Sequence, residues 1–290
     1  MLKVKSPAKL NLFLHITGRR EDGYHNLQTL FQFVDFYDDL EFEVLPTPHI
    51  ELKADIPGIA PGENLIEKAA KRLQAHKNIE QGARITLTKR LPMGGGMGGG
   101  SSNAASTLVA LNSLWQSGCT QKELADIGLA LGADVPIFIH GHAAMAKGVG
   151  EQFEDVEIPT PWYLIAMPNC HADTAQLFQE KQLTRDTKEI RIRDFLEGGG
   201  RNDFEPVLRK RFPIIDRTLQ LMSTIGQAKV TGSGACLFMS FPNQQQALNA
   251  EQQLTQNLAR FDLTNQDVSW KVAKGNNHSL LYSGDLAKQG

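Results

Sequence analysis

Between residues 94 and 100, six of seven positions are glycine, and two serines and an asparagine follow directly. Such a tract carries too little side chain to join a core, so it must be a turn or loop. Before it, apolar and polar residues alternate over 84–88, which predicts a strand that ends by Pro92. After it, apolar residues recur every third or fourth position from Ala104 to Trp115, which predicts a helix beginning at the serines. The chain therefore contains a strand, a glycine loop and a helix in direct succession.

This arrangement is suited to holding phosphate. The first amides of a helix have no intrahelical acceptor and lie at the positive end of the helix dipole. Glycines allow the backbone to approach an anion closely. The hydroxyls of Ser101 and Ser102 add donors to phosphate or a ligand for magnesium. We therefore expect the tract to bind phosphate.

Three other interpretations of the tract are weaker. A P-loop requires a lysine between the glycines and the serines, and there is none. Gly94, Gly96 and Gly99 satisfy the dinucleotide-binding spacing, but residues 114–119 lack the acidic residue expected about 20 positions later. A flexible linker is disfavoured because a capped amphipathic helix follows at once.

The remaining periodicity predicts an α+β fold. Strands are expected at 10–14, 40–44, 162–167, 229–230, 235–241 and 270–273, and helices at 64–77, 121–131, 204–224 and 244–258. The two kinds of element do not alternate steadily, which argues against a doubly wound sheet. A polar, proline-bearing stretch over 148–161 predicts a boundary between a first domain, 1–157, and a second, 158–290.

Composition excludes several classes of function. The net charge is −2 and no run of lysine or arginine exceeds three residues, so nucleic acid is not an expected partner. The three cysteines are far apart, which favours a reducing cytoplasm over a disulfide framework. The uncharged run 91–121 is rich in glycine, serine and asparagine, and its apolar part is too short to cross a bilayer, so no membrane association is expected.

Three motifs together resemble those of the GHMP kinases, the superfamily of galactokinase, homoserine kinase and mevalonate kinase. The segment 92–105 is similar to their central phosphate-binding motif, with Met97 where leucine is common. Residues 6–12 resemble the N-terminal motif, and residues 229–236 resemble the C-terminal glycine loop. The resemblance implies two α+β domains, an S5-like N-terminal domain and a ferredoxin-like C-terminal domain, with ATP and the acceptor meeting in the cleft between them.

Two further segments resemble one branch of this superfamily. Residues 18–27, which include Tyr24 and His25, look like the signature of members that act on a cytidine diphosphate-linked alcohol, and residues 131–136 match their catalytic-aspartate segment. The resemblance implies transfer of a phosphoryl group from ATP, with Mg²⁺, to the 2-hydroxyl of a cytidine diphosphate-linked methylerythritol. This reaction belongs to the non-mevalonate route to isoprenoid precursors.

The resemblance assigns catalytic roles to two residues. Asp134 matches the aspartate that serves as general base, whereas spacing alone would make it a turn residue before Pro136. Lys9 matches the lysine beside that aspartate, where it would keep the carboxylate ionised. Asn11 lies between two leucines of a strand, where burial without a partner is costly. It either holds substrate hydroxyls or satisfies a neighbouring loop.

The remaining site residues are expected from the same resemblance. Tyr24 is expected to stack on cytosine, His25 to hydrogen-bond the edge of the base, and Phe178 to supply the opposite stacking face. Gly232 and Ser233 are expected to contact the substrate from the C-terminal glycine loop. The residues expected to bind ATP are Asn64, Lys89, Pro92, Gly94, Gly95, Gly96, Met97, Gly98, Gly99, Gly100, Ser101, Ser102 and Asn103.

Some of these assignments have ordinary structural alternatives. Asn64 is as well explained as a helix cap, Lys89 as a solvated lysine and Asn103 as a first-turn residue. No carboxylate ligand for magnesium can be placed, so the metal site is left unknown. A monomer or weak homodimer is expected.

Three alternative functions remain. A GHMP enzyme acting on homoserine, mevalonate or a sugar is disfavoured by the segment around Tyr24 and His25. A binding-only sensor is disfavoured because it would need neither Lys9 nor Asp134. An RNA-binding module, suggested only by the S5-like topology, is disfavoured by the acidic charge balance.

Overall fold

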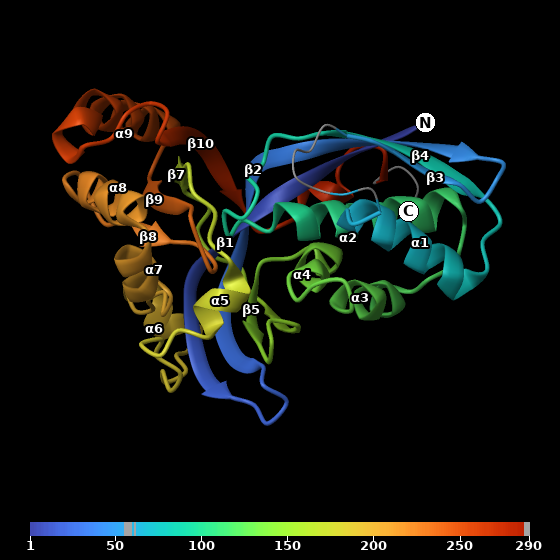
Figure 1. Ribbon diagram of the computed structural model, residues 1–290, viewed down its shortest axis with the longest axis horizontal. Helices are drawn as coiled ribbons and strands as arrows, with labels where there is room; N and C mark the ends of the chain where they lie inside the picture. Colours follow the sequence, from blue (N-terminus) through green and yellow to red (C-terminus); the bar gives the residue numbers. More distant parts are fainter. Residues whose placement is uncertain (55–59, 61, 287–290) are drawn as a thin grey trace.

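A computed structural model describes residues 1–54, 60 and 62–286 of the chain. The fold is α+β, as predicted, and has two lobes that lie side by side (Figure 1). The elements follow in the order β1 (Leu2–Arg19), β2 (His25–Leu45), β3 (Ile50–Lys53), α1 (Leu65–Lys77), β4 (Gly82–Thr88), α2 (Gly99–Leu114), α3 (Gln121–Leu129), α4 (Val135–His140), β5 (Ala144–Lys147), β6 (Gln152–Asp155), β7 (Trp162–Pro168), α5 (Thr174–Phe178), α6 (Ile192–Leu196), α7 (Glu205–Arg211), α8 (Pro213–Ser223), β8 (Lys229–Val230), β9 (Leu237–Phe241), α9 (Gln244–Asn257), η1 (Leu258–Phe261), β10 (Val268–Asn276) and η2 (Leu280–Tyr282).

The strand β2 organises the sheet. From His25 to Phe42 it pairs with β1 in an antiparallel hairpin. Along its other edge it pairs in turn with β5 at residues 29–31, with β10 at 33–34 and with β4 at 39–45. The strand β10 pairs with β7 as well, and β7 continues the sheet through β9 to β8. One continuous set of strands therefore runs through both lobes.

Each lobe has its own hydrophobic core. In the first, α1 and α2 pack on the layer formed by β1 to β4, and α3 and α4 pack on the other side of these helices (Figure 1). In the second, α7, α8 and α9 pack on β7, β9 and β10. A third cluster joins the two, and it contains Leu10 and Leu12 of β1 together with Ile165 and Phe238 of the second lobe. Because both faces of β1 are covered, every residue from Ser6 to Ile16 is buried, including the polar side chains of Lys9 and Asn11.

The predicted strands lie within β1, β2, β4, β7, β8, β9 and β10, although the strand predicted at 235–241 begins only at Leu237. The helix predicted over 204–224 is wrong as one element, because it is divided into α7 and α8. Phe212 between them is extended at φ −124° and ψ 91°. Pro213 follows it; a proline disfavours helical backbone at the preceding residue and cannot donate a backbone hydrogen bond.

The helix after the glycine tract begins two residues earlier than the serines predicted. Gly98 is its N-cap, and α2 starts at Gly99. The first bond of the helix joins the Ser102 amide to the Gly98 carbonyl at 2.7 Å. The last two glycines of the tract thus belong to the first helical turn. Among the described residues, no helix combines the length and apolarity needed to cross a membrane.

Candidate active site

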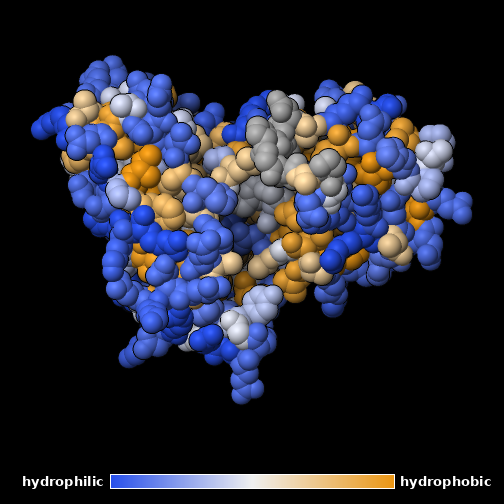
Figure 2. Space-filling model, viewed as in Figure 1, coloured by the Kyte–Doolittle hydropathy of each residue, from blue (hydrophilic) through white to orange (hydrophobic). Residues whose placement is uncertain are grey.

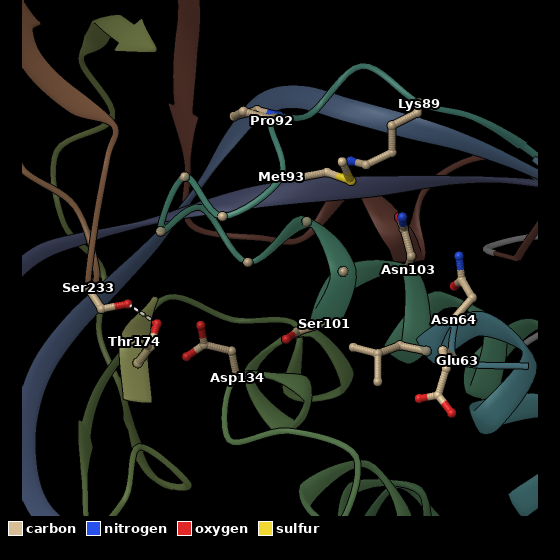
Figure 3. A pocket seen from close by; sticks show the side chains of 17 residues that line it. Glu63, Asn64, Lys89, Pro92, Met93, Ser101, Asn103, Asp134, Thr174 and Ser233 are labelled. Atoms are coloured by element: carbon tan, nitrogen blue, oxygen red, sulfur yellow. Dashed lines mark hydrogen bonds between the residues drawn. The ribbon is translucent and has the colours of Figure 1, made fainter. Parts of the chain in front are cut away.

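The glycine loop turns its backbone toward a cavity of about 350 Å³. The loop joins β4 to α2, and Gly98 takes the left-handed conformation, φ 73°, that starts the helix. No acidic residue lies in the first turn of α2. The exposed amides of this turn therefore face the cavity without competition from a carboxylate on their own helix. Figure 3 shows this cavity, and Figure 2 shows the surface hollowed between the two lobes.

Most of the residues predicted to bind ATP line this cavity, and two do not. Those that line it are Asn64, Lys89, Pro92, Gly94, Gly95, Gly96, Gly98, Gly99, Gly100, Ser101 and Asn103. Met97 instead packs in the cluster that joins the lobes, with 1% of its surface exposed. Ser102 is buried, and its hydroxyl accepts a hydrogen bond from Ser6 at 2.8 Å. Of the two serines, only Ser101 can offer its hydroxyl to a bound group.

Three residues at the edge of the cavity also have structural contacts. Asn64 caps α1 by accepting a hydrogen bond from the Ile66 amide at 2.9 Å. The ammonium of Lys89 pairs with buried Asp38 at 2.7 Å, and burial lowers the pKa of this lysine despite that carboxylate. Asn103 accepts a hydrogen bond from Ser6. Asn64 is therefore the helix cap of its structural alternative, whereas Lys89 is paired inside the protein and is not a solvated lysine.

The two glycine loops meet back to back. Gly96 of the first loop is at φ 75°, and a Cβ there would lie 2.2 Å from the Thr231 carbonyl oxygen. Gly232 of the second loop is at φ 59°, and its Cβ would lie 2.6 Å from the Gly96 carbonyl oxygen. Only glycine fits this mutual approach. The Cys236 amide also donates to the Gly95 carbonyl at 3.1 Å, so backbone contacts fix the two loops together.

Lys9 and Asp134 form an ion pair beside the first loop. The lysine Nζ lies 3.2 Å from the Asp134 carboxylate, and the two side chains are 2% and 39% exposed. The ammonium also donates to the Gly96 carbonyl at 3.0 Å and to Asn11 Oδ1. Asp134 occupies the N-cap position of α4 but makes no capping hydrogen bond, so its carboxylate is available to the cavity. The cation is buried and the carboxylate is accessible.

A second cavity of about 250 Å³ adjoins the first. The residues that line both are Gly96, Ser101, Asp134, Thr174 and Ser233. The second cavity also contains Lys9, Asn11, Phe178 and Gly232 from the predicted set. Figure 3 shows Ser101, Asp134, Thr174 and Ser233 below the glycine loop, with Thr174 bonded to Ser233. The carboxylate thus stands where the two cavities meet.

Asn11 is bonded within the protein. Its Nδ2 donates to Thr29 Oγ1 at 2.8 Å, and Thr29 donates in turn to the Phe13 carbonyl. Its Oδ1 accepts from Lys9, and its backbone amide donates to Thr231 Oγ1 at 2.8 Å. The side chain therefore orients Lys9 and joins β1 to β2, while the backbone amide joins β1 to the second glycine loop. It also lines the second cavity.

The three residues predicted to hold the base are only partly brought together. His25 stacks on Phe178 with ring centroids 4.8 Å apart and an angle of 18°. Phe178 lines the second cavity, whereas His25 and Tyr24 do not. Tyr24 lies in the turn between β1 and β2 with 66% of its surface exposed. Burial and nearby Arg185 lower the pKa of His25.

Sequence reasoning missed several residues of the two cavities. Thr174 begins α5, and the Asp173 carboxylate that caps this short helix was its only local signal. Thr29 and Phe31 come from the long strand β2, whose first half carried no recognised pattern. Glu63 lies beside the Asn64 cap at the edge of the first cavity. These residues converge only because distant segments fold together.

Glu63 and Asp134 supply the carboxylates that line the first cavity, and Ser101 is one of its hydroxyl-bearing residues. Elsewhere in the described chain, the ligand atoms of His76, Cys119 and Glu123 lie within 4.8 Å of one another. There, however, the Glu123 carboxylate is already occupied by Lys77 at 2.8 Å and by the Thr120 amide at 2.7 Å. Both oxygens of Glu123 are therefore occupied, which makes this cluster a poor metal site.

Comparisons with known proteins agree with this geometry. A family model described as "GHMP kinases N terminal domain" matches residues 64–142, and one described as "GHMP kinases C terminal" matches residues 180–260. A protein of Pseudomonas aeruginosa named 4-diphosphocytidyl-2-C-methyl-D-erythritol kinase is 49% identical over 97% of this chain and 96% of its own length. A solved structure of a 4-(cytidine 5'-diphospho)-2C-methyl-D-erythritol kinase superposes with a TM-score of 0.81 at 27% identity, covering 95% of this chain and 99% of that one. A homoserine kinase from Cytophaga hutchinsonii, at 18% identity and a TM-score of 0.68 over 96% and 95% of the two chains, shares the fold.

Proposed function

Since the chain belongs to the GHMP kinases, and among them to the family of the 4-diphosphocytidyl-2-C-methyl-D-erythritol kinases, we propose that it phosphorylates the 2-hydroxyl of 4-diphosphocytidyl-2-C-methyl-D-erythritol with ATP. This step belongs to the methylerythritol phosphate route to isoprenoid precursors. Two adjoining cavities, one beside each glycine loop, support the proposal.

The observation that carries the proposal is the position of Asp134. It lines both cavities and is held by a buried lysine, Lys9, at 3.2 Å. The first cavity has helix amides suited to phosphate, and the second is lined by Phe31, Phe178 and Phe204. A phosphoryl group bound by the glycine loop and an alcohol bound in the second cavity would therefore meet at this carboxylate.

In the proposed reaction the alcohol oxygen forms a bond to the γ-phosphorus of ATP. The bond between that phosphorus and the β,γ-bridging oxygen breaks, ADP leaves, and the proton of the alcohol passes to Asp134. Lys9, with its Nζ 3.2 Å from this carboxylate, holds it in place. The amides from Gly96 to Ser101 stabilise the charge on the transferred group, which is the main protein contribution in phosphoryl transfer.

Bound magnesium would supply positive charge that neutralises part of the charge on the ATP phosphates. The Ser101 hydroxyl lines the first cavity and is an oxygen donor of the type this ion prefers, so we propose it as a protein ligand of the ion. We further propose a cytoplasmic location, no nucleic-acid or membrane partner, a monomer or weak homodimer, and domains 1–157 and 158–290.

For the base, we propose that Tyr24 and Phe178 stack on cytosine and that His25 hydrogen-bonds its edge. The exposed Tyr24 in a turn is free to close over a ligand, whereas Phe178 is fixed by its contacts with His25 and Phe204. Gly232 and Ser233 would contact the diphosphate or the alcohol from the second loop. Recognition of the base thus involves both lobes.

The test is ADP formation by the purified protein with three alcohols: 4-diphosphocytidyl-2-C-methyl-D-erythritol, homoserine and mevalonate. We expect turnover with the cytidylyl alcohol alone. Turnover of either other alcohol in its place would refute the assignment of Tyr24 and His25 while leaving the fold intact. ATP binding without turnover of any of the three would favour a binding-only protein.

A further inference from the structure

A single arginine, Arg185, fixes the surroundings of His25. Its Nε donates to His25 Nε2 at 3.1 Å. Its NH2 group donates to the carbonyls of Phe178 and Glu180, each at 2.8 Å, and its NH1 group donates to the Leu183 carbonyl at 3.0 Å. One guanidinium therefore holds the ring of His25 and the backbone that carries its stacking partner, Phe178.

The contact with His25 determines where the histidine carries its proton. A guanidinium has only donors, so the nitrogen that faces it must be an unprotonated acceptor. A neutral imidazole with an unprotonated Nε2 carries its hydrogen on Nδ1. Within the described part of the chain, no protein acceptor is bonded to His25 Nδ1. The ring thus has one N–H donor left for a ligand.

We infer that Arg185 is a positioning and specificity-determining residue that locks His25 as the Nδ1–H tautomer, so that the histidine offers a donor to the edge of the pyrimidine. The inference rests on the proposed function in taking that pyrimidine to be cytosine. The fixed donor would explain why the site selects a cytidine compound over a uridine compound.

The two pyrimidines differ in what they present to such a donor. Cytosine has acceptors at N3 and O2, whereas uracil has a hydrogen on N3. A donor fixed opposite N3 is satisfied by cytosine and meets another donor in uracil. A histidine free to change tautomer could accept from uracil instead, so the lock is what creates the discrimination.

The charges around His25 keep the ring neutral. The positive groups near it are Arg185 and Arg19, and together with burial they lower its pKa. A protonated ring would place a second cation against the guanidinium. Lys147 of β5 and Glu189, in the segment after Arg185, pair with each other. The arginine therefore excludes both the imidazolium and the other neutral tautomer.

The first test reads the tautomer directly in the whole protein. Long-range ¹H–¹⁵N spectra of ¹⁵N-histidine-labelled wild type, with one signal among the eight histidines assigned through His25→Gln, distinguish a protonated Nδ1 from a protonated Nε2. We expect the Nδ1–H form near neutral pH. The Nε2–H form or the imidazolium would overturn the inference, whatever any arginine variant does.

The second test compares the binding of cytidine and uridine monophosphates by wild type, Arg185→Met and Arg193→Met. Arg193 is an exposed arginine of the same region whose partner is Glu197, and it serves as the matched control. We expect wild type and Arg193→Met to prefer the cytidine nucleotide, and the preference to fall by about tenfold in Arg185→Met, the effect of one mismatched hydrogen bond.

A purely structural role for Arg185 predicts that both nucleotides bind less well by the same factor, and this result would overturn the inference. Neither measurement requires turnover, so the two proposals can fail separately. Loss of phosphorylation with the cytidine preference retained would refute the proposed function alone. Turnover with an unchanged preference in Arg185→Met would refute the role of the arginine alone.

Discussion

The ammonium of Lys9 is almost wholly removed from water, yet it has three oxygens around it. These come from Asn11, from the Gly96 carbonyl and from Asp134. The ring of Phe31 lies beneath it, 5.3 Å from the nitrogen. A buried cation persists only where such partners offset the loss of water. The lysine therefore links the fold of the first lobe to the position of the Asp134 carboxylate.

We predict that Lys9→Met lowers both stability and turnover. The apolar stem keeps its volume, but the Gly96 carbonyl and Asn11 Oδ1 lose a donor, at a cost of about 2 kcal/mol in the free energy of unfolding. Turnover should fall about 100-fold or more, because the carboxylate loses its cation. Urea denaturation and steady-state kinetics measure the two effects.

The matched control is Lys3→Met on the same strand, where the lysine is exposed and pairs with Glu41. Such surface pairs contribute little, so this variant should behave like wild type. Equal effects of the two substitutions would contradict the role given to Lys9.

At the level of elements, the contact between the two glycine loops aligns the lobes. We predict that Gly96→Ala is more harmful than another glycine substitution at a similar backbone angle. Its Cβ would lie 2.2 Å from the Thr231 carbonyl oxygen and 2.5 Å from that of Gly234. Gly118, at φ 67°, has no atom within 4 Å of a Cβ and supplies the control.

In both variants an alanine must adopt the left-handed backbone conformation, which lowers the free energy of unfolding by about 1–2 kcal/mol. Only Gly96→Ala adds overpacking, roughly 1–3 kcal/mol more, and only it should weaken ATP binding. Thermal unfolding with and without nucleotide measures both quantities. Equal stability of the two alanine variants would show that the loops do not pack as described.

The cap of α3 gives a pH-dependent prediction. Lys77 and the amide and hydroxyl of Thr120 lower the pKa of Glu123 from 4.5 to about 2. Because this pKa is lower in the folded than in the unfolded state, its stabilising effect is present above about pH 4.5 and is lost as the pH falls toward 2. The difference in Tm between wild type and Glu123→Gln should shrink across this range. A difference that stays constant from neutral pH to pH 2 would contradict it.

The sequence pattern predicts those elements whose period is regular. The amphipathic helix α1, with its Asn64 cap, and the alternating part of β2 could be predicted closely. The short helices α5 and α6, of five residues each, carry too few apolar positions to show a period. The division of α7 from α8 was signalled by Pro213, but the apolar spacing continued across it and misled the prediction.

For the molecule as a whole, the candidate site could be predicted only in parts. The glycine loop was identifiable from physical chemistry, whereas the pairing of Lys9 with Asp134 came from resemblance, since 125 positions separate the two in the sequence. The contribution of Thr174 and Arg185 depends on how the second lobe meets the first, for which no local pattern exists. The structure shows which residues from distant parts of the sequence meet at the site, and the sequence pattern does not.

In the cleft between the lobes, the Asp134 carboxylate borders both cavities, so its proposed role as general base can be tested at one side chain. The most direct measurement is the turnover number of Asp134→Asn with saturating ATP and cytidylyl alcohol, together with its dissociation constant for ADP. We predict a loss of turnover of about 100- to 10,000-fold, the range for a general base, with ADP binding close to that of wild type. Turnover near the wild-type value would contradict the account, because the proton of the alcohol would then pass to a group other than Asp134.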